Sequence, residues 1–332
     1  MRQRIAVIGS GSWGTAIAYL LATNGHEVTL WCHSEDVAHT INQTHHHPHF
    51  LQTVDLSGIA ATTSFPDALN DCDAVVFVTP SSYLRDVAKQ CSYYIPSKLP
   101  VIVLTKGIEA MTGFTMLEVL YDVLGNTGRL ACLSGPNHAE EVSQGLPAAT
   151  VIASNGAECA CFFQSLFNAP AFRVYVSSDV KGVELCAATK NVIAIANGMC
   201  VAMNLGDNAS ASLVTRGLAE VRRLVIALGG DPRTCLGLAG MGDLMATCNS
   251  VHSRNRSLGA FLVEGGTLAE FEAKTHMVAE GAVACKTVTD LARKNNVEMP
   301  ISELVRRILW DDLSPKDAVD LLFERPLKSE TD

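Results

Sequence analysis

The residue with the clearest chemical potential in this sequence is Lys190, which lies in the apolar segment "VELCAATKNVIAIANGM" (183–199). Because this segment is apolar nearly all round, we expect a buried helix. Desolvation lowers the pKa of a buried amine, so Lys190 could exchange a proton near neutral pH. The alternative is a lysine that pairs structurally with Glu184 or reaches the surface.

Polar residues that follow predicted strands are the next candidates, because ligands of doubly wound sheets bind beyond the carboxyl ends of the strands. Three stretches have this position: "VTPS" (78–81), "LTKGIE" (104–109) and "LSGPNHAEE" (133–141). Lys106 lies in the second stretch, and as a nearby cation it would lower the pKa of Lys190 further. A solvated loop lysine is the alternative for Lys106.

A possible phosphate clamp lies later in the chain. Ser253, Arg254 and Asn255 follow Asp243, which ends a glycine-rich turn. The guanidinium of Arg254 can donate two parallel hydrogen bonds to a phosphate. A solvated basic loop is the alternative, and composition alone slightly favours it. Glu280, in "VAEG" (278–281), is either structural or close to a cofactor.

Three glycines near the amino terminus indicate a dinucleotide site. Gly9, Gly11 and Gly14 form a G-x-G-x-x-G pattern directly after an apolar run and at the start of a predicted helix. The first glycine permits a tight turn, the second lets the backbone approach a pyrophosphate, and the third allows close helix–strand packing. His33 ends the second predicted strand, acidic residues follow it and no arginine is near, so the residues leave NAD and NADP open.

The elements that must position these residues change type at about residue 178. Before it, short β-branched runs alternate with helical patterns, which is typical of a parallel sheet with crossover helices; after it, only helical patterns follow. The predicted strands are residues 4–9, 27–32, 58–63, 73–79, 100–105, 129–135, 148–153 and 171–176. We therefore expect a doubly wound α/β dinucleotide-binding domain over 1–178 and an all-α substrate-binding and catalytic domain over 179–332.

Composition narrows the function classes. A chain of 332 residues with 48% hydrophobic residues and a net charge of −9 favours two domains and small-molecule chemistry, and disfavours a nucleic-acid partner. Its eleven cysteines are scattered, so we expect reduced core thiols in a cytoplasmic protein.

The apolar run at 185–203 carries Lys190 and two asparagines, which favours a buried helix over a membrane span. "HHHPH" (45–49) predicts a surface loop, and no metal site is expected.

Seven stretches, taken together, resemble the bacterial NAD(P)-dependent glycerol-3-phosphate dehydrogenases over essentially the whole chain. They occur in the order and approximate spacing of that family: "GSGSWGTAIA", "TKGIE", "SGPNHAEEV", "ATKNVIAIANG", "GLAGMGDLMATC", "SRNR" and "VAEG". The resemblance implies a Rossmann-type first domain and a second domain like the carboxyl-terminal domain of 6-phosphogluconate dehydrogenase. It also implies reduction of dihydroxyacetone phosphate to sn-glycerol 3-phosphate for phospholipid synthesis, a slight preference for NADPH over NADH, and a possible homodimer.

The resemblance also implies roles for individual residues. Lys190 would be the catalytic acid/base, and Lys106 would stabilise the charge that develops on the substrate. The implied cofactor positions are Gly9, Gly11, Ser12, Trp13, Gly14, His33, Lys106, Ala139, Arg254, Val278 and Glu280. The implied substrate positions are Lys106, Gly135, Asn137, Lys190, Asp243, Ser253, Arg254 and Asn255. Asn137 and His138 depart from the family, which more often has a small hydroxyl residue and an aromatic residue there.

Two other functions fit part of the same evidence. A β-hydroxyacid or phosphogluconate dehydrogenase has the same two-domain plan and also uses a lysine of its helical domain. A regulator that binds NAD(H) without turnover would need the glycine pattern but no buried lysine. Activity with phosphorylated and unphosphorylated ketones separates these possibilities.

Overall fold

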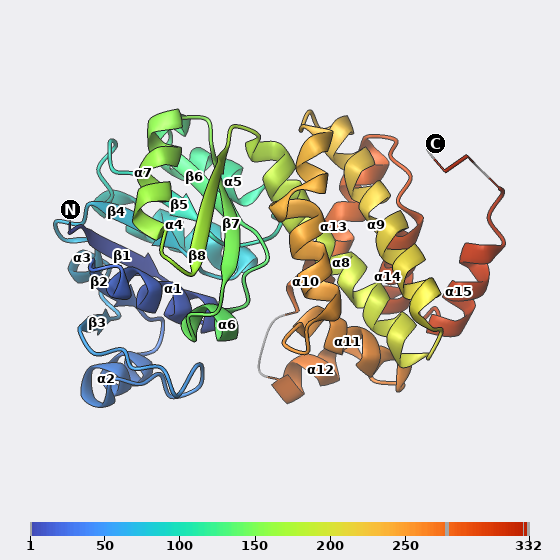
Figure 1. The fold of residues 1–332 in the computed structure, drawn as a ribbon, viewed down its shortest axis with the longest axis horizontal. Coiled ribbons are helices and arrows are strands. Elements are labelled where there is room, and N and C mark those ends of the chain that lie inside the picture. The colour runs from blue at the N-terminus through green and yellow to red at the C-terminus, as the bar shows by residue number, and fades with distance from the viewer. Residues whose placement is uncertain (1, 276–278, 328, 331–332) are drawn as a thin grey trace.

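The computed structural model describes residues 2–275, 279–327 and 329–330, which form an α/β part and a helical part side by side (Figure 1). The sheet has the order β3-β2-β1-β4-β5-β6-β7-β8. Its strands are β1 (Arg4–Ile8), β2 (Glu27–Trp31), β3 (Ile59–Thr62), β4 (Ala74–Phe77), β5 (Val101–Val103), β6 (Leu130–Ser134), β7 (Ala148–Ser154) and β8 (Phe172–Ser177). Each lies within a stretch predicted from the sequence or ends one residue beyond it.

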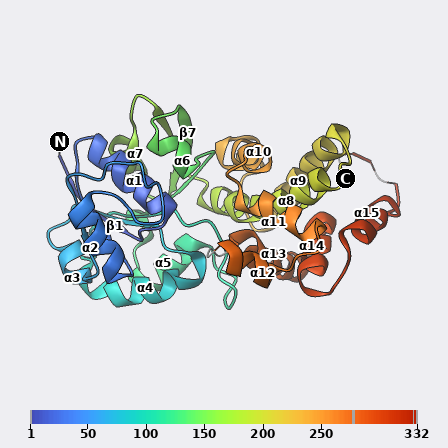
Figure 2. The ribbon, with the colours of Figure 1, turned by 90° about the horizontal axis from the view of Figure 1, so that it is seen from below.

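Helices cover both faces of this sheet (Figure 2). They are α1 (Ser12–Thr23), α2 (Glu35–Thr44), α3 (Phe65–Leu69), α4 (Leu84–Cys91), α5 (Met116–Leu124), α6 (Ala139–Ser143) and α7 (Ala157–Phe167). One buried apolar cluster joins α1 and α7 to one face, and a second joins α4 and α5 to the other. The central strands β4, β5 and β6 are buried on both faces, which accounts for their continuous apolar runs, whereas the edge strands β3 and β8 alternate between buried and exposed residues.

One strand pair differs from the predicted parallel sheet: β6 and β7 are antiparallel, while every other pair of neighbours is parallel. The connection between them contains only the five-residue helix α6. Such a helix rises about 7 Å, whereas a five-residue strand spans about 16 Å, so α6 does not return the chain to the starting edge of the sheet. The chain therefore re-enters the sheet in the opposite direction.

The helical part is built around α8 (Val180–Ala202), whose residues 182–200 are all buried. It packs against α9 (Asp207–Ala227), α10 (Asp243–Asn249), α11 (Arg254–Val263), α13 (Glu280–Lys294) and α14 (Pro300–Trp310), and also against β6. The remaining helices are α12 (Leu268–Thr275) and α15 (Pro315–Phe323). By length and composition α8 could span a membrane, but 89% of its apolar window is buried inside the protein, which confirms the prediction of a core helix.

The histidine-rich segment is not wholly a surface loop, which corrects the prediction. His47 is only 2% exposed, and its Nδ1 accepts hydrogen bonds from the backbone N–H groups of His49 (3.1 Å) and Phe50 (3.0 Å). The ring therefore closes a tight turn, a use of histidine that composition does not indicate. All eleven cysteines are free thiols, and nine of them are buried.

Candidate active site

The ammonium group of Lys190 is buried and held by two groups of α10. Lys190 is 5% exposed, its Nζ lies 2.6 Å from Oδ1 of Asp243, and it donates a hydrogen bond of 2.5 Å to Oγ1 of Thr247. The hydroxyl of Thr247 in turn donates to the backbone carbonyl of Asp243 (2.6 Å). Lys190 therefore neither reaches the surface nor pairs with Glu184, the alternative weighed from the sequence.

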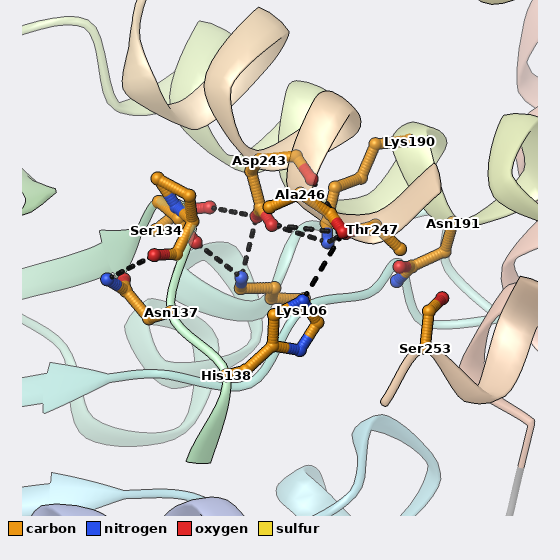
Figure 3. A network of polar contacts seen from close by, with 12 residues as sticks. Lys106, Ser134, Asn137, His138, Lys190, Asn191, Asp243, Ala246, Thr247 and Ser253 are labelled. Carbon is orange, nitrogen blue, oxygen red and sulfur yellow. Dashed lines mark hydrogen bonds and ion pairs between the residues drawn. The ribbon is translucent and has the colours of Figure 1, made fainter. Parts of the chain in front are cut away.

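Asp243 also binds the second lysine, so one carboxylate joins both. Nζ of Lys106, just beyond β5, donates to Oδ2 of Asp243 (2.6 Å) and to the carbonyl of Gly135 (3.2 Å). The hydroxyl of Ser134, the last residue of β6, donates to the same Oδ2 at 3.4 Å. Figure 3 shows these side chains converging from the sheet and from the helices α8 and α10. Two residues 84 positions apart in the sequence thus share a partner.

The charges of this cluster shift the pKa of its members. Burial lowers the pKa of Lys190 to about 8, against the attraction of Asp243, and the charge of Lys106 lowers it further. Burial opposes ionisation of Asp243, but the two ammonium groups outweigh it and hold the pKa of Asp243 below its usual range. At neutral pH the site therefore contains two cations and one anion, a net positive charge suited to an anionic substrate.

The predicted phosphate clamp begins helix α11 close to Lys190. Ser253 is buried and its Oγ accepts a hydrogen bond from the N–H of Arg256, so it caps the helix. Asn255 donates to Oδ1 of Asn191 (3.0 Å) and accepts from the N–H of Gly281 (3.0 Å). Arg254 is the first residue of α11 and its side chain is exposed. The start of α11 thus lies against α8 and α13, where Asn191 follows Lys190 directly.

The loop after β6 borders the lysine cluster. A Cβ at Gly135 would lie 2.8 Å from the Cα of Thr150, so a side chain does not fit there. Asn137 donates to the carbonyl of Ala149 (3.1 Å), while its Oδ1 is buried without a hydrogen bond among the described residues. The Nε2 of His138 lies 3.4 Å from the carbonyl of Ala246 in α10, and burial lowers its pKa. His138 therefore bridges the two parts of the chain beside Lys190 (Figure 3).

Different local constraints act on the three glycines of the first turn. Gly9 has a φ of +121°, which disfavours other residues, and a Cβ at Gly14 would lie 1.9 Å from the carbonyl oxygen of Gly9. A Cβ at Gly11 would meet no described atom within 4 Å. The fold itself requires Gly9 and Gly14, whereas the open space at Gly11 fits the close approach of a pyrophosphate. The turn therefore fits a dinucleotide.

Other predicted cofactor residues surround this turn. Ser12 begins α1 and donates to Oε1 of Glu140 (3.4 Å), and Trp13 has a buried Nε1 without a hydrogen bond among the described residues. Ala139 is buried at the start of α6, which packs against α1. His33 follows β2 and is exposed. Val278 lies outside the described residues.

Glu280 joins the two parts of the chain. Its Oε2 accepts a hydrogen bond from the hydroxyl of Ser81 (2.6 Å) and its Oε1 accepts from the N–H of Ser81 (3.1 Å). Ser81 belongs to the stretch after β4, and Glu280 begins α13. These contacts are consistent with a structural role for Glu280. They also place Glu280 at the edge of the sheet where the glycine turn lies.

Ser81, Ser134 and Thr247 have no individual role predicted from the sequence, although each lies in a stretch named above: 78–81, 133–141 and 237–248. Thr247 follows Asp243 by four positions on a helix, a spacing that places both on one face and that could have identified it. Ser134 lies near the end of the predicted strand 129–135. Its role as a partner of Asp243 depends on the docking of α10 against β6, which no local pattern indicates.

Comparison with known proteins agrees with this geometry. Two family models match: NAD-dependent glycerol-3-phosphate dehydrogenase N-terminus over residues 4–160, and the C-terminus of the same family over residues 179–320. A glycerol-3-phosphate dehydrogenase (NAD(P)+) of Corynebacterium urealyticum is 47% identical over 98% of this chain and 99% of its own, and that of Oceanobacillus iheyensis is 41% identical over 99% and 96%. A crystal structure of glycerol-3-phosphate dehydrogenase from Coxiella burnetii superposes with a TM-score of 0.94 at 36% identity, covering 98% of this chain and 99% of that one.

Proposed function

Because the chain belongs to the NAD-dependent glycerol-3-phosphate dehydrogenase family, we propose that it reduces dihydroxyacetone phosphate to sn-glycerol 3-phosphate with NADH or NADPH. The observation that carries this proposal is the buried pair of lysines joined by Asp243, next to a glycine turn that fits a dinucleotide. The product is the backbone of glycerophospholipids, so the reaction feeds their synthesis.

Lys190 is the proton donor of the proposed reaction. When bound, the nicotinamide coenzyme supplies a hydride to the ketone carbon. Lys190 gives a proton to the ketone oxygen, and Lys106 stabilises the negative charge that develops there. Asp243 keeps both ammonium groups in place, since it contacts each at 2.6 Å. Thr247 fixes the direction of the Lys190 side chain through its hydroxyl.

The substrate is held by groups on both sides of the lysines. In this proposal Arg254 binds the phosphate, aided by Ser253 and Asn255, because its guanidinium can donate two parallel hydrogen bonds and lies at the positive end of a helix. Gly135 and Asn137 contact the rest of the substrate from the loop after β6. Holding the phosphate at one end orients the ketone carbon for hydride transfer.

The proposed coenzyme contacts follow the glycine turn and its neighbours. Gly9, Gly11, Ser12, Trp13 and Gly14 would hold the pyrophosphate, and Lys106, Ala139, Arg254 and Glu280 would contact the rest of the coenzyme. Val278, outside the described residues, stays a predicted contact. His33 contacts the adenosine ribose. The first N–H groups of α1 point along a helix whose positive dipole end attracts phosphate. The buried Nε1 of Trp13 has no hydrogen-bond partner in the described part of the chain, which supports a polar ligand at this place.

A slight preference for NADPH is a finer part of the proposal. The hydroxyl of Ser34 does not cap α2, and together with His33 it leaves donors near the end of β2 for a ribose phosphate. Glu35 and Asp36, in the first turn of α2, act against a large preference. Comparing kcat/KM for NADPH and NADH at a fixed ketone concentration tests this point.

The organisation of the protein completes the proposal. We place the boundary between a coenzyme domain (1–178) and a substrate domain (179–332) between the end of β8 and the start of α8. Exposed apolar residues on the helical part, Val201, Leu205 and Ile226, support a homodimer. We also propose a cytoplasmic location. Light scattering of the purified protein tests the dimer, and fractionation of cells tests the location.

One spectrophotometric assay tests the central proposal. Purified protein is mixed with dihydroxyacetone phosphate and either NADH or NADPH, and loss of the reduced coenzyme is followed. Turnover with this ketone and not with unphosphorylated ketones or β-hydroxyacids is expected. Preference for an unphosphorylated substrate would favour a β-hydroxyacid dehydrogenase, and coenzyme binding without turnover on any ketone would favour a regulator.

A further inference from the structure

A small cavity adjoins Lys106 on the side of the sheet that meets α8. Its volume is about 10 Å³, and its lining includes Lys106, Ser134 and Glu184 together with the apolar residues Leu133, Val183 and Ala187. A cavity of about 10 to 15 Å³ with two or more polar groups in its wall can hold one water molecule. The volume is at the lower end of this range, and Glu184 of α8, Ser134 of β6 and Lys106 supply the polar groups.

Glu184 contributes a carboxyl group that the rest of the site leaves unused. The residue is 6% exposed, and its Oε1 accepts a hydrogen bond from the N–H of Leu117 in α5 (2.8 Å). Its Oε2 is buried and has no hydrogen bond of normal geometry among the described residues, although the hydroxyl of Thr115 lies beside it. The Thr115 hydroxyl interacts with this carboxyl group, and a carboxylate oxygen can accept more than one hydrogen bond, so Oε2 has room for a second donor.

Ser134 connects the other side of the cavity to the catalytic amine. Its hydroxyl donates to Oδ2 of Asp243 at 3.4 Å, and Oδ1 of the same carboxylate lies 2.6 Å from Nζ of Lys190. Because the Ser134 hydrogen points toward Asp243, its oxygen lone pairs can accept from another donor. The groups from Glu184 to Lys190 thus form a continuous series with one gap, and that gap is the cavity.

We propose that the cavity holds one water bonded to Glu184 and Ser134, and that Glu184, this water, Ser134 and Asp243 form a proton path to Lys190. The inference rests on the proposed reaction, in which Lys190 loses one proton for each ketone reduced. Glu184 touches neither substrate nor coenzyme; it is a positioning residue that acts through the water and Asp243.

The proton transfers along this path balance. After Lys190 has protonated the ketone oxygen, the Glu184 carboxyl gives a proton to the water, the water gives one to Ser134, and Ser134 gives its own hydroxyl proton to the Asp243 carboxylate. The carboxylic acid formed at Asp243 then gives its proton to the neutral amine of Lys190. The net change is one proton moved from Glu184 to Lys190, and Glu184 recovers it from solvent. No oxidant or further reactant is needed.

The surroundings of Glu184 suit this role. Burial raises its pKa to about 7, and the nearby Glu118 raises it further, while the Thr115 hydroxyl, the Leu117 N–H and Lys181 lower it. Cys132 and Lys106 face it across the cavity. The side chains of Glu118 and Lys181 pair with each other and are 40% and 33% exposed, so the outer side of Glu184 leads toward solvent. The carboxyl is therefore mostly protonated below pH 7 and ionises as the pH rises through about 7.

The test compares Glu184→Gln, Ser134→Ala and the double variant with the unaltered enzyme. Gln keeps the shape of the side chain and an oxygen for the Leu117 N–H, but it has no acidic proton. We expect kcat for ketone reduction to fall several-fold below pH 7, where Glu184 is protonated, and the deficit to shrink above about pH 8. Coenzyme affinity should stay unchanged. The double variant should be no less active than the less active of the two single variants, because both substitutions interrupt the same path.

Glu220→Gln is the matched control. Glu220 is also a fully buried glutamate whose pKa is raised to about 7, but it accepts from the N–H groups of Ile301 and Ser302 at the start of α14 and lines no part of the cavity. Its substitution should leave kcat unchanged at every pH. A deficit of Glu184→Gln that is independent of pH, additive losses in the double variant, or the same effect in Glu220→Gln would overturn the proposal.

A high-resolution crystal structure gives a second measurement if Glu184→Gln does not fold. A water within hydrogen-bond distance of Oε2 of Glu184 supports the path, and an empty cavity overturns it. Wild-type protein that does not reduce dihydroxyacetone phosphate would instead contradict the proposed function itself. The two failures are therefore distinguishable.

Discussion

At the scale of single residues, the site depends on one carboxylate shared by two amines. Asp243 lies 2.6 Å from both Lys106 and Lys190, so each ammonium group is paired although it is close to a like charge. Without that carboxylate the two cations would repel each other in a buried place, where Coulomb interactions are strong. The shared partner lets Lys190 stay protonated at neutral pH while its pKa remains close enough to 7 for proton transfer.

Lys190→Ala should lower kcat for ketone reduction by at least about a hundredfold, because the proton donor is lost. The affinity for NADH or NADPH should be kept, since the glycine turn is not altered. Steady-state kinetics and fluorescence titration of the reduced coenzyme measure the two quantities. Turnover close to that of the wild type would exclude Lys190 as the acid.

The pH dependence of the two reaction directions should be opposite. Reduction needs the protonated amine of Lys190, whose pKa is lowered to about 8, so its rate should fall as pH rises through about 8. Oxidation of glycerol 3-phosphate needs the neutral amine and should become faster over the same interval. Initial rates in both directions from about pH 6 to pH 10 check this, and parallel profiles would contradict the role of Lys190.

Arg254→Ala should raise KM for dihydroxyacetone phosphate about tenfold or more, since charge-assisted hydrogen bonds to a phosphate are lost. The effect on kcat should be smaller, because the lysine cluster is intact. Arg222→Ala, at an exposed arginine of α9, serves as the control for a change in net charge. An unchanged KM for Arg254→Ala would place the phosphate elsewhere.

At the scale of elements, two glycines of one turn are glycine for different reasons. Gly14 is required because α1 approaches the carbonyl of Gly9, whereas Gly11 has open space around it. The fold explains the first constraint, and Gly11 is the position at which we propose that the backbone approaches a pyrophosphate. The antiparallel β7 is a second example, because the short α6 that directs it also carries Ala139 and places His138 beside α10.

Gly11→Ala and Gly14→Ala should therefore fail in different ways. Gly14→Ala should lower the free energy of unfolding by about 1 to 3 kcal/mol, because its Cβ would lie 1.9 Å from a backbone oxygen. Gly11→Ala should keep wild-type stability but weaken coenzyme binding. Thermal unfolding and coenzyme titration of both variants separate the two effects. Equal loss of stability in both would mean that Gly11 is a folding requirement.

At the scale of the whole molecule, the two parts are joined by polar groups at the site itself. Lys106 pairs with Asp243, Ser81 with Glu280, and Glu184 with the N–H of Leu117. Each pair links the α/β part to the helical part. The orientation of Lys190 toward the sheet thus depends on how the two parts dock, and so does the positive charge that attracts the substrate.

Buried glutamates should make global stability depend on pH. The pKa of Glu220 is raised from 4.5 to about 7, so the folded state keeps a proton that the unfolded state releases above pH 4.5. Its contribution is present below that pH and is lost as pH rises through about 7, by up to about 3 kcal/mol. Glu220→Gln should lose less stability than the wild type between about pH 5 and pH 8 in urea unfolding. An equal loss would mean that Glu220 is ionised in the folded protein at both pH values.

The sequence by itself determined the elements and most of the candidate residues. Local periodicity and glycine placement predict the eight strands, the change to helices at residue 178, the burial of residues 185–200 and the turn at Gly9–Gly14. The seven shared stretches indicated the family. These features are local, because hydrophobic period and turn chemistry act over a few neighbouring residues.

Only the tertiary structure decided which groups meet. Contacts between elements distant in the chain pair Lys190 with Asp243 instead of Glu184, and they add Ser134 and Thr247 to the site. The link between Ser81 and Glu280 and the reversed direction of β7 depend on such contacts too. A buried lysine needs a partner, but sequence spacing cannot choose among several acids. That choice is made by the docking of α10 between α8 and the sheet, which brings one carboxylate within reach of both amines.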